Sequence, residues 1–226
     1  MKSLVPFVMI ALLTFCSGLA FAIPEDSSRE LDAALFEAAE RNDAARIRQL
    51  LKQGASIHAQ DGKGQTALLA AVDRNHIASA RRLIEAGSDV NVQDRQLDSP
   101  LLLAGARGYL EILKLTLQAN PDFTIYNRFG GTALIPACER GHVEVVRELL
   151  QTDVDINHVN RLGWTALLEA IILSEGGPRH QEIVRMLLDA GADINLPDGD
   201  GISPLQHARH KGFTPIVHML ESAGAR

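Results

Sequence analysis

The fold of this chain is decided by the stretch Asn127-Arg128-Phe129-Gly130-Gly131-Thr132-Ala133-Leu134-Ile135-Pro136-Ala137-Cys138-Glu139-Arg140-Gly141-His142. Its central phrase, Thr132-Ala133-Leu134-Ile135, recurs with small changes at Thr66, Ser99 and Thr165, so that successive copies stand 33 residues apart. A fixed period of this length is typical of a solenoid, whose units bury their apolar faces by stacking on one another. Such a scaffold presents a long surface and seldom encloses a catalytic pocket. The period therefore favours binding over catalysis.

The period divides the chain into six units. They are predicted to span residues 30–60, 61–93, 94–126, 127–159, 160–197 and 198–226. The divergent first unit and the short last unit are expected to cap the two ends of the stack. The fifth unit has 38 residues, and its five extra residues fall around Ser174-Glu175-Gly176-Gly177-Pro178. Loops accept insertions at small entropic cost, so we expect a tolerated loop there, with a functional lip as the alternative.

The quoted stretch closely resembles the ankyrin repeat, and so do Val145-Val146, Leu149-Leu150 and Asp155-Ile156-Asn157 after it. The resemblance covers nearly all of residues 30–226, because turn, cap, helix and loop signals recur together in register. It implies an all-α dominated repeat solenoid of about six stacked ankyrin repeats. Each unit is then a β-hairpin finger followed by two antiparallel helices.

Residue chemistry supports the same architecture. Hydroxyl side chains suited to cap a helix N-terminus stand at Thr66, Ser99, Thr132, Thr165 and Ser203. Glycines suited to a positive φ stand two residues earlier, at Gly64, Gly130, Gly163 and Gly201. Leu97 replaces this glycine in the third unit, so we expect a distorted finger there. Pro136 lies early in a first helix, where it removes one hydrogen bond without necessarily breaking the helix.

Residues 1–22 read as a secretory signal peptide. An apolar stretch from Leu4 to Phe15 follows Lys2, and Ala20 and Ala22 are placed as in an Ala-x-Ala cleavage site. An uncleaved membrane anchor is the rival interpretation, although an anchor usually needs about 20 apolar residues. A lipid anchor on Cys16 is disfavoured by the bulky Phe15 before it. The sequence thus predicts export, to the bacterial periplasm or, as second choice, into the medium, with no membrane attachment after cleavage.

Charge and cysteine content restrict the function further. Without residues 1–22 the chain has 21 basic and 28 acidic side chains, a net charge of −7. This balance disfavours nucleic acid, because phosphate binding relies on uncompensated basic charge. Cys138 is the one cysteine left, so no intramolecular disulfide is expected. It occupies a small-residue position of a first helix and is expected to be buried and inert.

The eight histidines do not form a convincing metal or catalytic site. His76 and His142 fall at an inter-helix turn that ankyrin repeats commonly fill with histidine, and His58, His158 and His180 stand in connecting segments. The nearest approach to a cluster is His207, His210 and His218, but a structural metal needs three or four converging ligands. We predict no enzyme, no cofactor and no metal. The competing enzyme hypothesis would require a metal at His207 and His210 or a reactive Cys138.

Two rows of arginines are expected on the concave face, which the resemblance implies as the binding surface. The second position of successive units holds Arg95, Arg128 and Arg161, and the end of the first helix holds Arg41, Arg74, Arg107 and Arg140. We expect the rows to engage an acidic patch on a partner protein. The alternative is solvated charge that is partly neutralised within each unit, since Glu40, Asp73 and Glu139 directly precede three of these arginines.

Apolar residues at the same exposed positions are the predicted anchors. Phe129 and Leu162 follow their tip arginines, and Trp164 precedes a cap. Aromatic and arginine side chains together are typical of interface hot spots. The alternative is that Phe129 and Leu162 pack on each other, while Ile172 and Leu173 bury beneath the inserted loop.

We therefore predict an exported monomer that binds another protein. The chain also resembles bacterial exported ankyrin proteins. That resemblance implies either an accessory to a periplasmic peroxide-removing enzyme or an immunity protein against a secreted toxin.

Overall fold

A computed structural model describes residues 25–226, which form twelve α-helices in six pairs. The predicted signal peptide, residues 1–22, lies outside the described residues. The helices are α1 (Glu25–Glu40), α2 (Ala44–Lys52), α3 (Ala67–Asp73), α4 (Ile77–Glu85), α5 (Pro100–Arg107), α6 (Leu110–Gln118), α7 (Leu134–Glu139), α8 (Val143–Leu149), α9 (Ala166–Ile172), α10 (Pro178–Asp189), α11 (Pro204–His210) and α12 (Thr214–Ser222). Each pair is one predicted unit, numbered 1 to 6 below. α1 begins before residue 30, the predicted start of unit 1.

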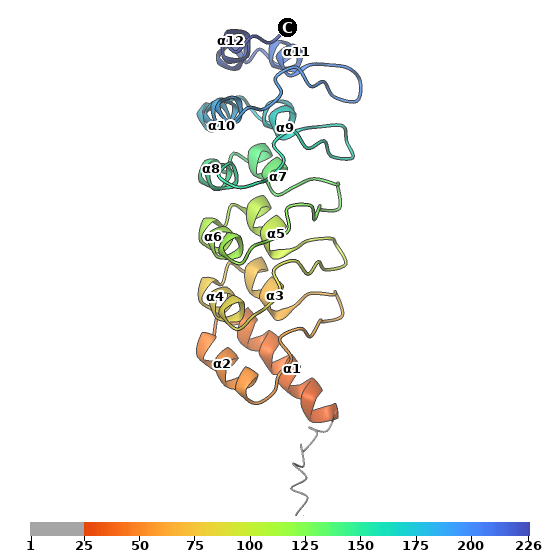
Figure 1. The fold of residues 1–226 in the computed structure, drawn as a ribbon, viewed down its shortest axis with the longest axis vertical. Helices are drawn as coiled ribbons and strands as arrows, with labels where there is room; N and C mark the ends of the chain where they lie inside the picture. Colours follow the sequence, from red (N-terminus) through yellow and green to blue (C-terminus); the bar gives the residue numbers. More distant parts are fainter. Residues whose placement is uncertain (1–24) are drawn as a thin grey trace, which may run out of the picture.

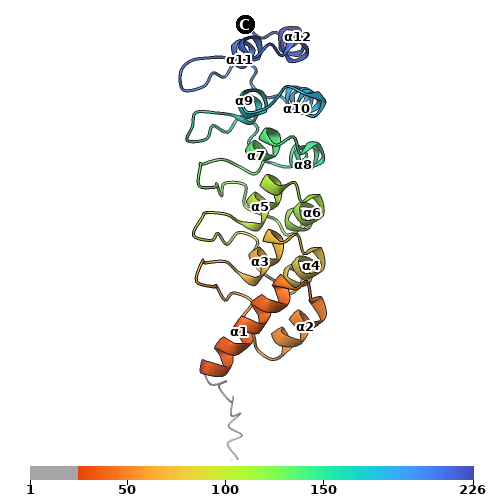
Figure 2. The same ribbon diagram turned by 180° about the vertical axis from the view of Figure 1, so that it is seen from behind.

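The units stack into an elongated solenoid. The first helices of the units (odd numbers) form one column and the second helices (even numbers) form another (Figure 1). The loops that precede each first helix, called tips below, project beside the odd-numbered column on the side away from the second helices (Figures 1 and 2). One apolar core runs through the whole stack, from Leu35 in α1 to Leu220 in α12. Burial of this continuous core is what makes each unit depend on its neighbours.

Hydroxyl caps begin four of the first helices as predicted. The side chains of Thr66, Ser99, Thr165 and Ser203 each accept a hydrogen bond from the backbone N–H three residues ahead. The prediction for Thr132 was wrong, because α7 begins only at Leu134 and the buried Thr132 hydroxyl has no hydrogen-bond partner among the described residues. Pro136 gives the reason. It has no N–H to donate to the Thr132 carbonyl, the bond that starts the first helix in the other four units.

Each tip from unit 2 onward is closed by the side chain of its first residue. In unit 5 the Asn160 Oδ1 atom accepts from the N–H groups of Leu162 and Trp164, at 2.9 and 3.1 Å. Asp61, Asp94, Asn127 and Asp198 accept from the same two positions of their own tips. Among residues 25–226 the β-structure is limited to an isolated bridge between Gln60 and Thr66. The predicted β-hairpins are therefore loops held by these side-chain bonds together with backbone bonds, such as that from the Asp61 N–H to the Gln65 carbonyl at 3.0 Å.

Leu97 does not distort the tip of unit 3, contrary to the prediction. Its N–H donates to the Asp94 carbonyl at 3.0 Å, as the N–H of Gly130 donates to the Asn127 carbonyl at 2.8 Å. Leu97 reaches this geometry by adopting a φ of 61°, close to the 72° of Gly130. A left-handed conformation costs an L-residue about 1–2 kcal/mol. The tip thus keeps its shape, and the strain falls on one residue.

Replacing Leu97 by glycine is expected to stabilise the protein by about 0.5–1 kcal/mol. The change removes the left-handed strain, and the greater freedom of glycine in the unfolded chain offsets part of the gain. Urea unfolding of wild type, Leu97→Gly and Leu97→Ala measures the effect. Alanine keeps the strain and should not stabilise. A loss of stability in the glycine variant would mean that the Leu97 side chain, 39% exposed, packs more tightly than the strain costs.

The insertion in unit 5 lies between α9 and α10, as predicted, and also lengthens α10 to 12 residues. Ser174 is buried within the loop, and Gly176 adopts a φ of 63° over the ring of Phe213 in unit 6. A Cβ atom on Gly176 would lie 2.6 Å from that ring. The loop is thus packed against the next unit. Leu173, just before it, stays 47% exposed, so the alternative in which the loop covers this residue is wrong.

Candidate functional site

A hollow of about 540 Å³ opens on the face formed by the tips and first helices of units 3, 4 and 5. Gly131 in the tip of unit 4 and Pro136 in α7 both lie on its wall. The corresponding tip position in unit 5 holds Trp164. This cavity, called the hollow below, lies on the side of the tips and first helices, where the sequence predicted the binding surface.

Three large apolar side chains form one side of the hollow. Phe129 is 50% exposed, Leu162 is 53% exposed and Leu173 is 47% exposed, and all three line the cavity. Phe129 and Leu162 belong to adjacent tips, which are joined by a hydrogen bond from the Arg161 N–H to the Phe129 carbonyl at 2.8 Å. Their exposure shows that contact with each other does not cover them. The hollow therefore presents apolar surface on a rigid support.

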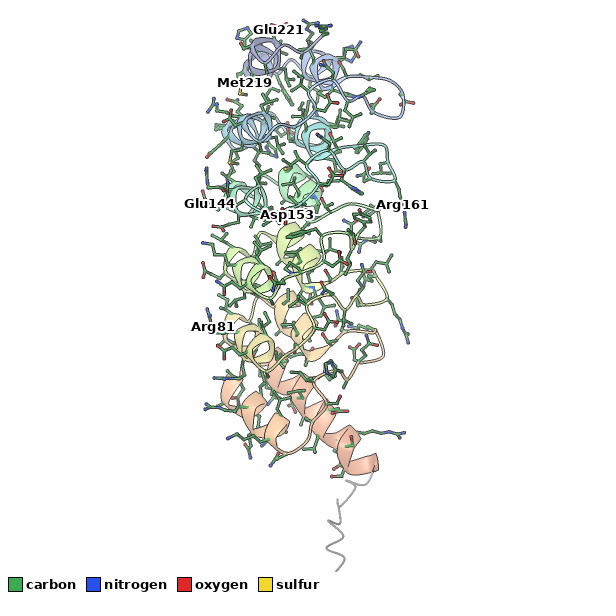
Figure 3. All side chains as sticks on the ribbon, viewed as in Figure 1. Arg81, Glu144, Asp153, Arg161, Met219 and Glu221 are labelled. Carbon is green, nitrogen blue, oxygen red and sulfur yellow. The ribbon has the colours of Figure 1, made fainter. Side chains whose placement is uncertain are left out.

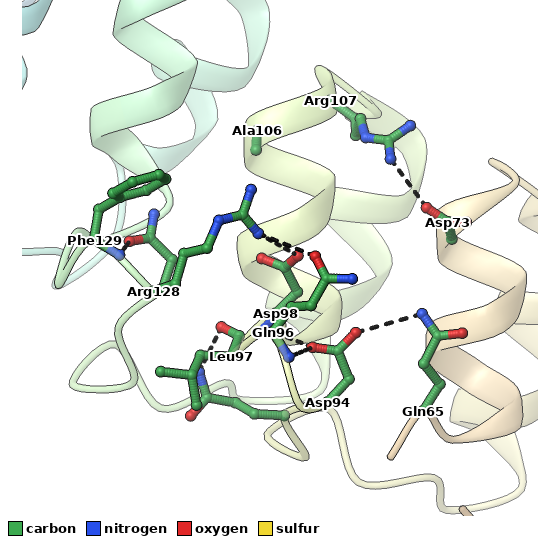
Figure 4. Close-up of polar contacts among 12 residues, drawn as sticks. Gln65, Asp73, Asp94, Gln96, Leu97, Asp98, Ala106, Arg107, Arg128 and Phe129 are labelled. Carbon is green, nitrogen blue, oxygen red and sulfur yellow. Dashed lines mark hydrogen bonds and ion pairs between the residues drawn. The ribbon is translucent and has the colours of Figure 1, made fainter. Parts of the chain in front are cut away.

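The predicted arginines of the tips differ in their surroundings. Arg128 reaches back toward unit 3, where its guanidinium lies 3.3 Å from the Gln96 side-chain oxygen and 3.6 Å from Asp98 (Figure 4). Arg161 donates to the Arg128 carbonyl at 3.0 Å and projects from the tips, on the side of the molecule opposite to Arg81 and Glu144 (Figure 3). Arg95 is exposed and forms no ion pair among residues 25–226. Of the three tip arginines, Arg128 and Arg161 are thus bonded to neighbouring groups, whereas Arg95 is exposed and has no ion pair among the described residues.

The arginines at the ends of the first helices form a second row, called the inner row. Arg41 in unit 1 pairs with Glu37 of its own unit at 2.6 Å, and each later arginine bonds to the unit before its own. Arg74 pairs with Glu40 at 3.0 Å, and Arg107 pairs with Asp73 at 3.1 Å (Figure 4). Arg140 donates to the Ala106 carbonyl at 2.6 Å, because unit 3 has alanine where the acid would stand. Neutralisation therefore runs between units, whereas the sequence suggested pairing within each unit.

The inner row is interrupted in unit 5. Leu173 occupies the position of Arg140, and the row resumes in unit 6 with Lys211, which donates to the Ile172 carbonyl at 2.6 Å. Glu139 consequently has no cation from the following unit. Its nearest cation is Arg140 beside it, with 3.9 Å between the two charged groups. Glu40, Asp73 and Glu139 each stand directly before an inner-row arginine. Glu40 and Asp73 pair with an arginine of the following unit, whereas Glu139 does not.

Glu169 on α9 is a buried acid at the wall of the hollow. Its side chain accepts a hydrogen bond from the Asn160 amide at 2.8 Å, and the residue is only 5% exposed. Burial, and then the negative charge of Glu139, raise the pKa of Glu169 from 4.5 to about 7. Within residues 25–226 it forms no ion pair. A carboxyl group that carries a partial charge at neutral pH thus lines the hollow, and the positive charge of Arg140 offsets only part of the rise in its pKa.

The structure brings together five of the predicted binding residues around the hollow. They are Arg107, Arg128, Phe129, Arg140 and Leu162. Arg74, Arg95, Arg161 and Trp164 lie outside its lining, and Trp164 is half-buried. Sequence reasoning missed Glu139 and Glu169 as parts of the site. The signal was present in the register, because the position of Glu169 holds Ala70, Leu103, Pro136 and His207 in other units.

The histidines and the cysteine have structural surroundings. His76, His142 and His180 each bond a backbone carbonyl of the preceding unit, those of Ala39, Ala106 and Glu139 respectively. His207 bonds Asp198 at 2.7 Å, closing the tip of unit 6, an acidic neighbour that the sequence did not reveal. Cys138 is fully buried as predicted, and burial raises its pKa well above the usual value. In the described part of the chain, no group of three metal-binding side chains converges.

The sequence profile of the family described as ankyrin repeats (3 copies) matches residues 13–94, 35–127 and 101–198. No helix within residues 25–226 combines the length and apolar character needed to cross a membrane. Among solved structures, a crystal structure of an ankyrin repeat domain from Acinetobacter baumannii AYE is 55% identical, with a TM-score of 0.83. The match covers 85% of this chain and 98% of that one.

Two further similarities agree. The crystal structure of EF0377, an ankyrin repeat protein, is 40% identical with a TM-score of 0.81, over 84% of this chain and 97% of that one. The ankyrin repeat protein YahD of Escherichia coli (strain K12) is 48% identical over 58 residues, which is 26% of this chain. The matched segment spans 29% of the length of that relative.

Proposed function

Because the chain belongs to the ankyrin-repeat family, whose repeats generally mediate protein–protein interaction, we propose that it is a non-enzymatic scaffold that binds a partner protein in the hollow of units 3 to 5. The observation that carries this proposal is the half-exposed trio Phe129, Leu162 and Leu173 around the hollow. Large apolar side chains gathered at one place on a surface mark interaction sites. Their rigid support limits the entropy lost on binding.

The arginines around this apolar surface supply polar contacts in the proposal. Arg95 and Arg161 stand at exposed tips, where Arg95 can meet acidic groups of the partner and Arg161 can do so beside its bond to the Arg128 carbonyl. Arg107, Arg128 and Arg140 already bond neighbouring units, so we assign them mainly to holding the shape of the hollow. We keep Trp164 as a candidate contact outside the hollow. Anchoring thus rests on the apolar trio, and an acidic patch on the partner is a secondary feature.

The double variant Phe129→Ala/Leu162→Ala is expected to lose at least about tenfold in affinity for the partner, since truncating central apolar anchors costs more than about 1.4 kcal/mol. Both side chains are half-exposed, so the free energy of unfolding should change by less than about 1 kcal/mol. Immobilised wild type and variant are compared for the proteins each captures from an extract of the native cells, identified by mass spectrometry.

Arg81→Ala/Glu144→Ala is the matched control, because both residues are exposed on the second-helix side of the stack. We expect the control to capture the same proteins as wild type. A partner captured equally well by wild type and by Phe129→Ala/Leu162→Ala would contradict the proposed site. Trp164→Ala, measured separately, tests the contact outside the hollow.

We further propose export, on the strength of the signal-like sequence of residues 1–22. N-terminal sequencing of the protein isolated from its native cells tests it, with Ile23 as the expected first residue. An accessory role beside a peroxide-removing enzyme and a role as a toxin antagonist are both compatible with a binding scaffold. The identity of a captured partner distinguishes them.

A further inference from the structure

The interruption of the inner row leaves a place for a cation at the hollow. Arg74, Arg107, Arg140 and Lys211 each extend a cationic group to the last turn of the first helix in the preceding unit. Leu173 is the inner-row position of unit 5 and extends no charge toward Glu139. The acid and the vacant place are both at the wall of the hollow, because Glu139 and Leu173 line it.

Glu169 adds a second acid at the same place. The residue is only 5% exposed, and one of its carboxyl oxygens accepts a hydrogen bond from the Asn160 amide. The other oxygen has no hydrogen-bond partner among residues 25–226 and is not sealed from the cavity. Glu139 acts on Glu169 electrostatically, so the two carboxyl groups share one environment. Two neighbouring carboxyl groups, one of them with an oxygen that has no hydrogen-bond partner beside the hollow, are complementary to a cation of another molecule.

The arginines that line the hollow do not fill this place. Arg107 is bonded to Asp73 in unit 2, and Arg128 is bonded to Gln96 and Asp98 in unit 3. Arg140 is bonded to the Ala106 carbonyl in unit 3, and its Nε atom lies 3.9 Å from the Glu139 carboxylate. Arg107 and Arg128 are therefore engaged toward the N-terminal end of the stack, and Arg140 is shared between unit 3 and Glu139. Arg140 offsets only part of the effect of burial and of Glu139 on Glu169, whose pKa stays raised.

We propose that the hollow accepts an arginine side chain of the partner protein, whose guanidinium binds Glu139 and Glu169 and whose methylene groups pack on Leu173. The inference rests on the proposed function and names the residue that the partner inserts. A guanidinium suits the place better than an ammonium group, because its planar fork can bond two carboxylates and is more weakly hydrated in a half-buried site. The net charge of the chain without residues 1–22, −7, favours the approach of a basic segment.

The test uses Nα-acetyl-arginine N-methylamide as the probe, with the neutral citrulline analogue and the acidic glutamate analogue as comparisons. NMR titration at pH 8 and low salt follows the side-chain carboxyl carbons of the glutamates. We expect saturable binding of the arginine probe with a dissociation constant in the millimolar range, and at least about tenfold weaker binding of citrulline, because charged hydrogen bonds are the stronger ones.

Three variants make the test specific. Glu169→Gln removes one acid, and Leu173→Arg restores the missing position of the inner row from within; each is expected to weaken the arginine probe at least about tenfold. Glu175→Gln is the matched control, since it removes an exposed acid of the inserted loop that does not line the hollow, and its affinity should stay within about threefold of wild type. Circular dichroism of each variant verifies folding.

The inference is overturned if the arginine probe does not bind, if citrulline binds as well, if glutamate binds more tightly, or if Leu173→Arg binds the arginine probe as wild type does. Its failure is separable from failure of the proposed function. The probe needs no partner, whereas the Phe129→Ala/Leu162→Ala capture experiment needs no arginine. If that variant loses capture and the arginine probe does not bind, the hollow is still the binding site and the proposed arginine contact is wrong.

Discussion

Replacing Gly105 by valine is expected to destabilise the stack by about 3 kcal/mol. Gly105 is buried on α5, where a Cβ atom would lie 2.9 Å from both the Cβ and the carbonyl oxygen of Ala133 at the start of α7. A backbone oxygen cannot rotate away, so units 3 and 4 would have to separate. Overpacking of this kind costs about 1–3 kcal/mol, toward the upper end when backbone must move. The equivalent positions of other units hold larger side chains, Val72, Cys138 and Ile171.

Urea unfolding followed by circular dichroism measures the effect. Ala106→Val is the matched control, because Ala106 is the next residue of α5 and is only half-buried on the wall of the hollow. We expect the control to change the free energy of unfolding by less than about 1 kcal/mol. Equal stability of Gly105→Val and wild type would show that units 3 and 4 are not in close contact. The close approach also matters for function, since α5 and α7 together form the floor beside Arg107 and Arg140.

Glu169→Gln is expected to stabilise the protein by about 3 kcal/mol at pH 8 and by less than about 1 kcal/mol at pH 5. The folded protein raises the pKa of this carboxyl from 4.5 to about 7, mainly by burial. Above pH 4.5 the unfolded chain ionises first, so the ionised group costs stability progressively until about pH 7, and the full cost remains at higher pH. Glutamine stays neutral and can still accept the hydrogen bond from Asn160.

The measurement is the difference in free energy of unfolding between variant and wild type, determined by urea at both pH values. Taking the difference cancels the titration of groups that the two proteins share. Glu175→Gln, an exposed acid in the inserted loop, is the control and should change stability by less than about 0.5 kcal/mol at either pH. A stabilisation by Glu169→Gln that is the same at pH 5 and pH 8 would contradict a cost of ionisation.

The register of the repeat was predictable because its signals are local. Thr66, Ser99 and Thr165 bond the backbone three residues ahead, and a left-handed residue stands two positions earlier, Gly64, Leu97 and Gly163 respectively, so the start of each unit is marked by local signals. Thr132 shows the limit of reading such a signal alone. Pro136, four residues later, removes the bond that the cap would have begun, and α7 begins at Leu134, one residue later than the cap predicts.

Other features depend on contacts that a single unit does not contain. Leu97 was expected to deform its tip, but Asp94 holds the turn through two side-chain bonds, and the backbone of Leu97 yields instead. Pairing of Arg107 with Asp73 crosses 34 residues, so reading each acid together with the arginine beside it gives the wrong partner. Burial of Glu169 likewise follows from stacking. Sequence reasoning therefore named five residues that line the hollow, while its acids escaped notice.

The inner row gives the stack a direction. Each inner-row cation from unit 2 onward bonds the unit that precedes it in the chain. In a regular stack, an internal unit would therefore accept one such bond from the following unit and donate one to the preceding unit. Residues 160–197 perform only the first, because Ile172 accepts from Lys211 while Leu173 donates nothing. The vacancy is consequently a property of that segment. Transplanted behind any other unit that ends its first helix with an acid, the same segment would carry the vacancy with it and create an unpaired carboxylate at the new junction.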